Sequence, residues 1–178
     1  MDAADVAALI DRYGADAYRF CRRLTTAPAD ADDLYQQTFL RLMEMSVRLD
    51  REQNPRALIF SVASGLYRNS ERKRARRQNA APSFSIDQED PPALPVSADD
   101  TERQVLNRLR GEALRAAIET LKPVLRTAVL LFYAFDLPVE DIARIEHVPA
   151  GTVKSRLYKA RQLLKTRMEE KGYDGYQN

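Results

Sequence analysis

Apolar residues recur every three or four positions along most of this chain, and no segment alternates strictly between apolar and polar residues. A period near 3.6 places side chains on one face of an α-helix, whereas a half-buried strand needs a period of two. The pattern therefore predicts an all-α fold. We expect helices over 2–24, 30–49, 55–77, 101–120 and 123–132, and two more within 137–168 that are separated at 146–148.

The segment 78–102 interrupts this pattern, because it has four prolines and six acidic residues but no Lys or Arg. Such composition disfavours a packed core, and compact domains rarely contain an irregular loop of this length. We therefore expect two small helical domains, joined by a flexible acidic linker. The predicted boundaries are 1–77 for the first domain, 78–102 for the linker, 103–171 for the second domain and 172–178 for a tail.

The two predicted helices within 137–168 have the pattern of a helix-turn-helix, in which the second helix can enter a DNA major groove. Glu140 and Asp141 complement the dipole at the start of the first helix. The inward set of the second helix is Val153, Leu157, Ala160 and Leu164. Its outward set includes Lys154, Ser155, Arg156, Tyr158, Lys159 and Arg161.

The helix that begins at Pro55 changes character along its length, from an apolar face to a basic tract. Glu71 is the one acid among the basic residues Arg68, Arg72, Lys73, Arg74, Arg76 and Arg77. Crowded positive charges favour a polyanionic partner. The alternative is a solvated helix end whose cations offset the C-terminal dipole. Phe60 and Tyr67 offer ring faces to unstacked bases, although aromatic residues at helical spacing more often belong to a core.

The predicted helix over 30–49 has a second face beside its apolar stripe. This face mixes acidic, amide and apolar residues: Asp33, Gln36, Gln37, Leu40, Arg41 and Met43. Such a face can hold a partner helix. From spacing alone, a solvated surface is the more frequent explanation.

Several classes of function are disfavoured by the composition. The single cysteine, Cys21, cannot form an intramolecular disulfide, and it lies on an apolar stripe where a small buried thiol is expected. Without Cys or His partners, His147 is not expected to bind zinc. There is no glycine-rich phosphate loop and no nucleophilic triad, so we expect no enzyme, cofactor or metal. No apolar run spans a bilayer and the N-terminus is unlike a secretory signal, which predicts a cytoplasmic protein without membrane insertion.

These motifs together resemble the extracytoplasmic-function (ECF) sigma factors of the sigma-70 family, over essentially the whole chain. The segment DADDLYQQTFLRLM is similar to the helix that binds the polymerase clamp, with Gln37 replacing the usual Glu of a D-x-x-Q-E-x-F pattern. The segment PRALIFSVASGLYRNSERKRARR is similar to the helix that melts the promoter and reads its upstream hexamer. LPVEDIARIEHVPAGTVKSRLYKARQLLK is similar to the helix-turn-helix of the second domain.

The resemblance implies a subunit that binds core RNA polymerase and directs promoter-specific transcription initiation, with a linker joining two DNA-binding domains. It implies polymerase binding through Asp33, Gln36, Gln37 and Phe39. It implies capture of the minus-ten element by Tyr67, Arg68, Asn69, Arg72 and Lys73. The minus-thirty-five element would meet Thr152, Lys154, Ser155, Arg156, Tyr158, Lys159 and Arg161. An anti-sigma factor is a further expected partner, and the free chain is expected to be monomeric.

The chain departs from the family pattern in the third helix. Leu58 stands where family members often have Trp, and Ser64 with Gly65 stands where Arg-Asn is common. A glycine in a helix interior costs about 1 kcal/mol relative to Ala, which suggests a kink or a close approach at Gly65.

Three alternatives remain open from the sequence. A conventional helix-turn-helix regulator would bind duplex DNA without polymerase, but it would not need the first domain or the linker. An all-helical adaptor would carry its charges as solvated faces. An RNA-binding module would show salt-sensitive binding without promoter-dependent initiation.

Overall fold

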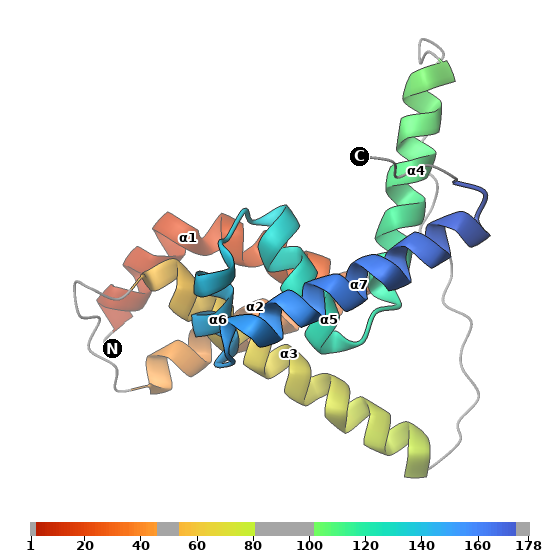
Figure 1. Cartoon of the computed structure of the whole chain (residues 1–178). Helices are drawn as coiled ribbons and strands as arrows, with labels where there is room; N and C mark the ends of the chain where they lie inside the picture. The colour runs from red at the N-terminus through yellow and green to blue at the C-terminus, as the bar shows by residue number, and fades with distance from the viewer. Residues whose placement is uncertain (1–2, 46–53, 81–101, 174–178) are drawn as a thin grey trace.

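The computed structural model describes residues 3–45, 54–80 and 102–173, and within these ranges the chain is helical without strands. In chain order the elements are α1 (Ala3–Leu24), α2 (Pro28–Glu44), α3 (Pro55–Ala80), α4 (Glu102–Glu119), α5 (Pro123–Val129), the π-helix η1 (Leu130–Ala134), α6 (Val139–Glu146) and α7 (Ala150–Glu170). The all-α prediction is confirmed (Figure 1). None of the described helices is long and apolar enough to cross a membrane.

The first half of the molecule is a three-helix bundle of α1, α2 and α3, which all pack against one another. Its core includes Phe20, Leu24, Leu42, Ile59 and Phe60, none of which is more than 1% exposed. The predicted Asn cap of α3 is confirmed, because Asn54 Oδ1 accepts the backbone N–H of Arg56 at 3.1 Å. Pro55 occupies the first helical position, where its missing N–H costs nothing.

Three expected boundaries are wrong. Helix α2 begins at Pro28 with Ala27 as its N-cap, so Asp30 lies in the first turn and complements the dipole instead of capping. The same helix ends at Glu44 and not at Leu49, and residues 46–53 lie outside the described residues. Helix α3 continues to Ala80, so the first residues of the predicted linker are helical, while 81–101 lie outside the described residues.

The second half is organised around α5 and η1, which the sequence indicated as its buried centre. Residues 125–131 are all buried, and α5 packs against α7. The helix was expected to continue to Phe132, but its last turn widens into the π-helix η1. The turn that follows contains Asp136 in the left-handed region, at φ 50°, before α6 begins.

Helices α6 and α7 form the predicted helix-turn-helix. His147 terminates α6 in the left-handed conformation, at φ 53°, and the N–H of Val148 bonds to the carbonyl of Ala143 at 3.0 Å. The N–H of His147 also donates to the carbonyl of Arg144, at 3.3 Å, so this is a Schellman ending, which turns the chain sharply toward α7. The expected inward residues Val153, Leu157 and Ala160 are buried, and Leu164 is half-buried.

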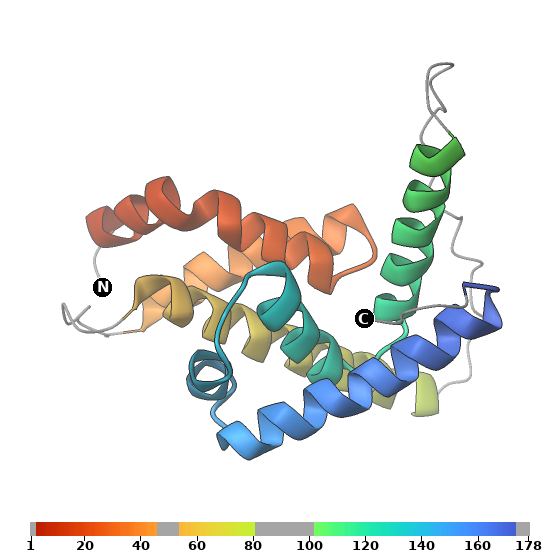
Figure 2. The same cartoon turned by 45° about the horizontal axis from the view of Figure 1, so that its top comes forward.

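The two halves share one continuous hydrophobic core, and α3 packs against both α5 and α6. Figure 2 shows these helices together at the centre of the molecule. Phe135, which follows η1, inserts between α1 and α3. Its ring centroid lies 5.3 Å from that of Phe20 and 5.0 Å from that of Phe60. At the end of α1, Arg126 of α5 donates a 2.6 Å hydrogen bond to the carbonyl of Leu24. Aromatic packing and a buried hydrogen bond therefore hold the second half onto the first.

Helix α4 extends away from this body at its N-terminal end (Figures 1 and 2). Leu106 and Leu109, two members of its expected apolar stripe, are each 44% exposed. Burial of the stripe begins at Ala113 and continues at Ala117.

Candidate nucleic-acid interface

The exposed face of α2 carries the residues that the clamp-helix motif singles out. Asp33, Gln36 and Gln37 are exposed, and two large apolar side chains flank them, Leu40 at 58% and Met43 at 45% exposure. Phe39, predicted to bind polymerase, is instead only 5% exposed. Phe39 therefore supports α2 from the core side and does not touch a partner directly in this conformation.

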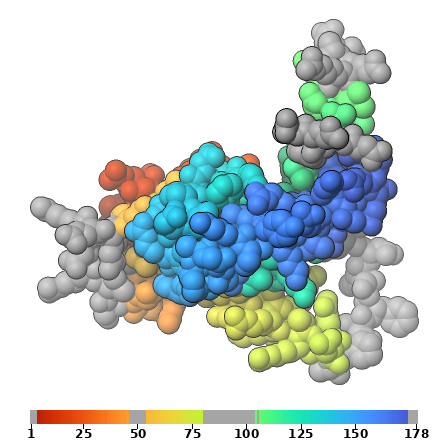
Figure 3. Space-filling model, viewed as in Figure 1, coloured from red at the N-terminus to blue at the C-terminus, as the bar shows by residue number. Residues whose placement is uncertain are grey.

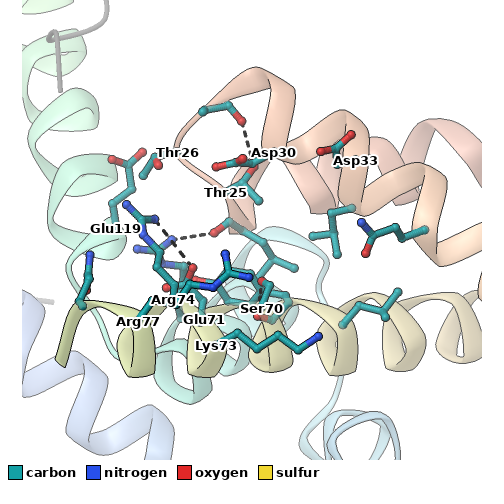
Figure 4. Close-up of a pocket in the computed structure, with 18 residues that line it drawn as sticks. Thr25, Thr26, Asp30, Asp33, Ser70, Glu71, Lys73, Arg74, Arg77 and Glu119 are labelled. Atoms are coloured by element: carbon teal, nitrogen blue, oxygen red, sulfur yellow. Dashed lines mark hydrogen bonds and ion pairs between the residues drawn. The ribbon is translucent and has the colours of Figure 1, made fainter. Parts of the chain in front are cut away.

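A groove of about 820 Å³ separates this face from the basic end of α3. In Figure 4, Asp30 and Asp33 of α2 lie on one side of it, Lys73 and Arg77 of α3 lie on the other, and Glu119 stands at one end. The groove contains charges of both signs. It marks the border between the amide-rich face of α2 and the cationic face of α3.

The predicted minus-ten residues of α3 divide into exposed and enclosed members. Asn69, Arg72 and Lys73 are exposed and lie within one turn or so of one another on α3. Tyr67 is 3% exposed, with the guanidinium of Arg126 5.9 Å from its ring centroid. Burial raises the pKa of Tyr67 to about 12, against the lowering effect of Arg126. In this conformation Tyr67 is a core residue and offers no ring face to a base.

The last turns of α3 project from the body as a cationic arm, visible at the end of the helix in Figure 3. Its side chains are exposed from Arg72 to Asn79. Glu71 lies 3.9 Å from Arg74, a long ion pair that balances a small part of the charge. The arm keeps an excess of positive charge where a polyanion can reach it.

The outer face of α7 presents the second set of predicted DNA contacts. Lys154, Ser155, Tyr158, Lys159 and Arg161 are exposed, with Tyr158 at 61%. Thr152 is half-buried, and the hydroxyl of Ser155 donates to its carbonyl at 2.9 Å. A first turn of mostly small residues followed by exposed long cations suits a helix that enters a major groove.

Exposed Tyr133, from η1, extends the outer face of α7. Its hydroxyl oxygen lies 3.5 Å from Nη1 of Arg161. The sequence pattern gave no indication that Tyr133 is exposed, because this residue belongs to a nearly continuous apolar run.

Two predicted DNA contacts are joined by a residue that the sequence analysis placed in the turn. Glu146 has a fully buried side chain, and its Oε2 lies 2.5 Å from Nη1 of Arg68. The same oxygen accepts a 3.0 Å hydrogen bond from Nη1 of Arg156. Arg68 belongs to the first half and Arg156 to the second, so one carboxylate connects the two predicted promoter-reading faces.

Cys21 is fully buried, as expected for a small core thiol, and burial raises its pKa to about 12. Across the described ranges, no group of three or more His, Cys, Asp or Glu side chains is placed to hold a metal ion.

The chain matches two protein-family models. Residues 9–77 match the family model for sigma-70 region 2, and residues 111–164 match that for sigma-70 region 4. The first match covers all of α2 and most of α1 and α3. The second covers the helix-turn-helix and the helices that support it.

Curated relatives align across both regions. The ECF RNA polymerase sigma factor SigL of Mycobacterium tuberculosis is 32% identical over 172 residues, which is 96% of this chain and 93% of SigL. SigE of Mycolicibacterium smegmatis is 30% identical over 158 residues, 88% of this chain. The aligned part is 59% of the length of SigE.

Solved structures share the fold. The sigma factor RpoE of Bartonella quintana, in complex with the anti-sigma factor NepR, has a TM-score of 0.70 at 22% identity and covers 93% of this chain and 97% of its own. CnrH, in complex with the cytosolic domain of CnrY, has a TM-score of 0.62 at 17% identity and covers 95% and 90%. The likeness to SigL along nearly its full length, with both regions matched, shows that the chain belongs to the ECF sigma factors of the sigma-70 family, which bind core RNA polymerase and direct promoter-specific initiation.

Proposed function

We propose that this sigma factor binds core polymerase and the two promoter elements through three different surfaces of the described chain. The exposed face of α2 binds the clamp of core RNA polymerase. The outer side of α3 captures the minus-ten element, and the outer face of α7 reads the minus-thirty-five element. The observation that carries this proposal is that most of the polar contacts implied by the resemblance are exposed on α2, at the end of α3 and on α7, whereas Arg68, Thr152 and Arg156 are half-buried.

For polymerase binding, Asp33, Gln36 and Gln37 supply directional polar contacts, and Leu40 with Met43 supplies apolar area. An interface needs both, because apolar burial drives association and polar groups fix its register. Phe39 acts indirectly. Its ring packs 5.0 Å from that of Tyr35, which stiffens α2 beneath the binding face.

For the minus-ten element, Asn69, Arg72 and Lys73 are the available contacts, and the cationic arm beyond them holds phosphates. Unstacking a base costs a few kcal/mol, which contacts to the flipped base must recover. With Tyr67 enclosed, the described surface of α3 has little aromatic area for this purpose. We therefore expect weak melting and strict promoter choice. Permanganate footprints that show wide opening at many unrelated promoters would contradict this expectation.

For the minus-thirty-five element, Lys154 lies near the start of α7, where side chains reach base edges, and Lys159 lies farther along the exposed face. A good direct contact contributes about 1–3 kcal/mol of discrimination. Arg161 lies beyond both and suits a phosphate contact, which positions the helix without reading sequence. Ser155 is a weaker candidate, because its hydroxyl already bonds within the helix.

We further propose an anti-sigma factor as a regulatory partner. Such a partner, the anti-sigma factor NepR, is named in the structure of RpoE, whose fold this chain shares. An inhibitor that covers the α2 face or the outer face of α7 would block function. We place the protein in the cytoplasm, where core polymerase acts, and assign it no catalytic step of its own.

Reciprocal variants test the division of surfaces. Asp33→Ala with Gln36→Ala should abolish association with core polymerase and spare binding of the isolated chain to promoter duplex. Lys154→Ala with Lys159→Ala should retain core binding and lose promoter choice. A conventional helix-turn-helix regulator would respond to the second pair alone and would not co-purify with core enzyme.

A further inference from the structure

The first observation is the position of the Glu146 carboxylate at the seam between the two halves. Its side chain is fully buried, whereas those of Arg68 and Arg156 keep 16% and 20% exposure. Arg68 comes from α3, and Arg156 comes from the recognition helix α7. A single carboxylate therefore occupies two guanidinium groups that lie on different DNA-reading helices.

The second observation is that this seam has further specific contacts. The hydroxyl of Ser61, on α3, donates to the carbonyl of Ile145 at 2.9 Å and lies 3.1 Å from Nε2 of His147. Phe135 fills the gap between α1 and α3 nearby, at 8% exposure. Directional bonds of this kind select one docked arrangement of the two halves.

Together with the proposed promoter contacts, this geometry leads to a regulatory role that rests on the proposed function. We infer that Glu146 is a latch that closes the free protein by holding Arg68 and Arg156 together and so withholding both from promoter DNA. Phosphate and carboxylate compete for the same planar guanidinium donors. While Glu146 holds them, α3 and α7 cannot separate to reach two DNA elements.

The latch is poised to open because its contacts are incompletely satisfied. The Arg68 contact is short but lacks hydrogen-bond geometry, and within the described residues Glu146 Oε1 is buried without a hydrogen-bond partner. A buried carboxylate oxygen without a donor keeps its desolvation cost, and a buried ion pair often contributes little net stability. Opening returns this oxygen to water. Binding of polymerase or DNA to the separated halves then needs to supply only a modest free energy.

The test compares Glu146→Gln with Glu140→Gln in the full chain. Both changes remove one negative charge from α6, but Glu140 is exposed and lies at the other end of the helix. Binding to a short mixed-sequence duplex is measured by fluorescence anisotropy, and the spread of the two halves by small-angle X-ray scattering. The apparent affinity of a protein is reduced by the fraction of its binding-competent state, so E146Q should bind DNA about tenfold more tightly than wild type. It should also have a larger radius of gyration, while E140Q resembles wild type in both measurements.

Ser61→Ala provides a second variant that leaves the arginines intact and removes the bond to Ile145. It should shift both readouts in the same direction by a smaller amount. The latch is overturned if E146Q binds DNA no better than E140Q, or if it binds more tightly while its scattering remains that of the closed form. If E146Q fails to fold, an S61A variant identical to wild type in both readouts overturns it. Scattering does not depend on promoter recognition, so this failure is distinct from failure of the proposed function, which run-off transcription decides.

Discussion

The cationic arm of α3 and the outer face of α7 carry similar side chains in different surroundings. The arm projects beyond the shared core, and its residues from Arg72 onward are exposed. On α7, Lys154 and Lys159 are exposed, but Arg156 turns inward to Glu146. The difference shows that charge on a helix does not define a DNA-binding surface. Packing between the two halves decides which cations a ligand can reach.

The same contrast separates two kinds of recognition. The arm has many cations and few partners, which suits phosphate binding without sequence preference. The face of α7 combines cations with exposed Ser155 and Tyr158, which suits the reading of base edges. The predictions below disturb one of these surfaces, or the packing that distinguishes them.

The largest effect is expected from Phe135→Ala, which removes the side chain that joins the second half to α1 and α3. Loss of a buried Phe typically costs about 3–5 kcal/mol, so we expect a decrease of about 3 kcal/mol in the free energy of unfolding. Urea denaturation followed by circular dichroism measures this change. Tyr133→Ala, at a position that is 52% exposed, is the control and should cost under about 1 kcal/mol. A stability equal to that of wild type would show that Phe135 does not hold the halves together.

The next largest effect concerns DNA binding, in which variants of the two cationic surfaces should differ. Lys154→Ala with Lys159→Ala should weaken binding to the cognate promoter by about 2–3 kcal/mol and reduce discrimination against other sequences. Arg76→Ala with Arg77→Ala should lower affinity for all sequences and reduce the salt slope by about two. Titrations with cognate and scrambled duplexes at several salt concentrations measure both quantities. Identical behaviour of the two variants would contradict the assignment of base reading to α7 and of phosphate binding to the cationic arm.

Alkaline pH should lower the free energy of unfolding, because two core residues of the first half have ionisable side chains. Burial raises the pKa of Cys21 and that of Tyr67 to about 12, from ordinary values of 9.0 and 10.0. The unfolded chain therefore loses these protons first, and the associated stability is intact below pH 9 and declines as the pH rises toward 12. Urea midpoints between pH 8 and pH 11 test this, and Cys21→Ala should flatten the decline. A midpoint that stays constant with pH would contradict the burial of both groups.

The smallest effect concerns Gly65, in the middle of α3. A Cβ at this position would meet no heavy atom within 4 Å, so the close approach that the sequence suggested is absent. Gly65→Ala should therefore stabilise the protein by up to about 1 kcal/mol through its better helix propensity. Gly172→Ala is the opposite control, because φ is +77° there and a side chain is strained. Thermal unfolding should rank G65A above wild type and G172A below it.

Local pattern predicted those parts of the fold that depend on neighbours in sequence. The period of 3.6 placed Val153, Leu157 and Ala160 in the core of the second half, and the Asn54 cap followed from its position before Pro55. The start of α2 was missed because Ala27 caps it without a side-chain bond. In such a case the sequence has no capping residue to recognise.

Contacts between the two halves were not predictable in this way. Glu146 looked like a residue of the turn, and nothing local indicated that its carboxylate meets Arg68 on a distant helix. Buried Arg126 and the role of Phe135 likewise depend on segments about a hundred residues away. The burial of Phe39 and Tyr67 was also not predictable, because a family motif marks a position in the sequence but does not define the direction of its side chain.

The decisive experiment is run-off transcription with purified core RNA polymerase. The chain should associate with core enzyme and produce transcripts with one defined start on a cognate promoter. Lys154→Ala with Lys159→Ala should lose those transcripts while remaining bound to core enzyme. A wild-type chain that neither joins core polymerase nor directs it to any defined start site would show that this protein does not initiate transcription.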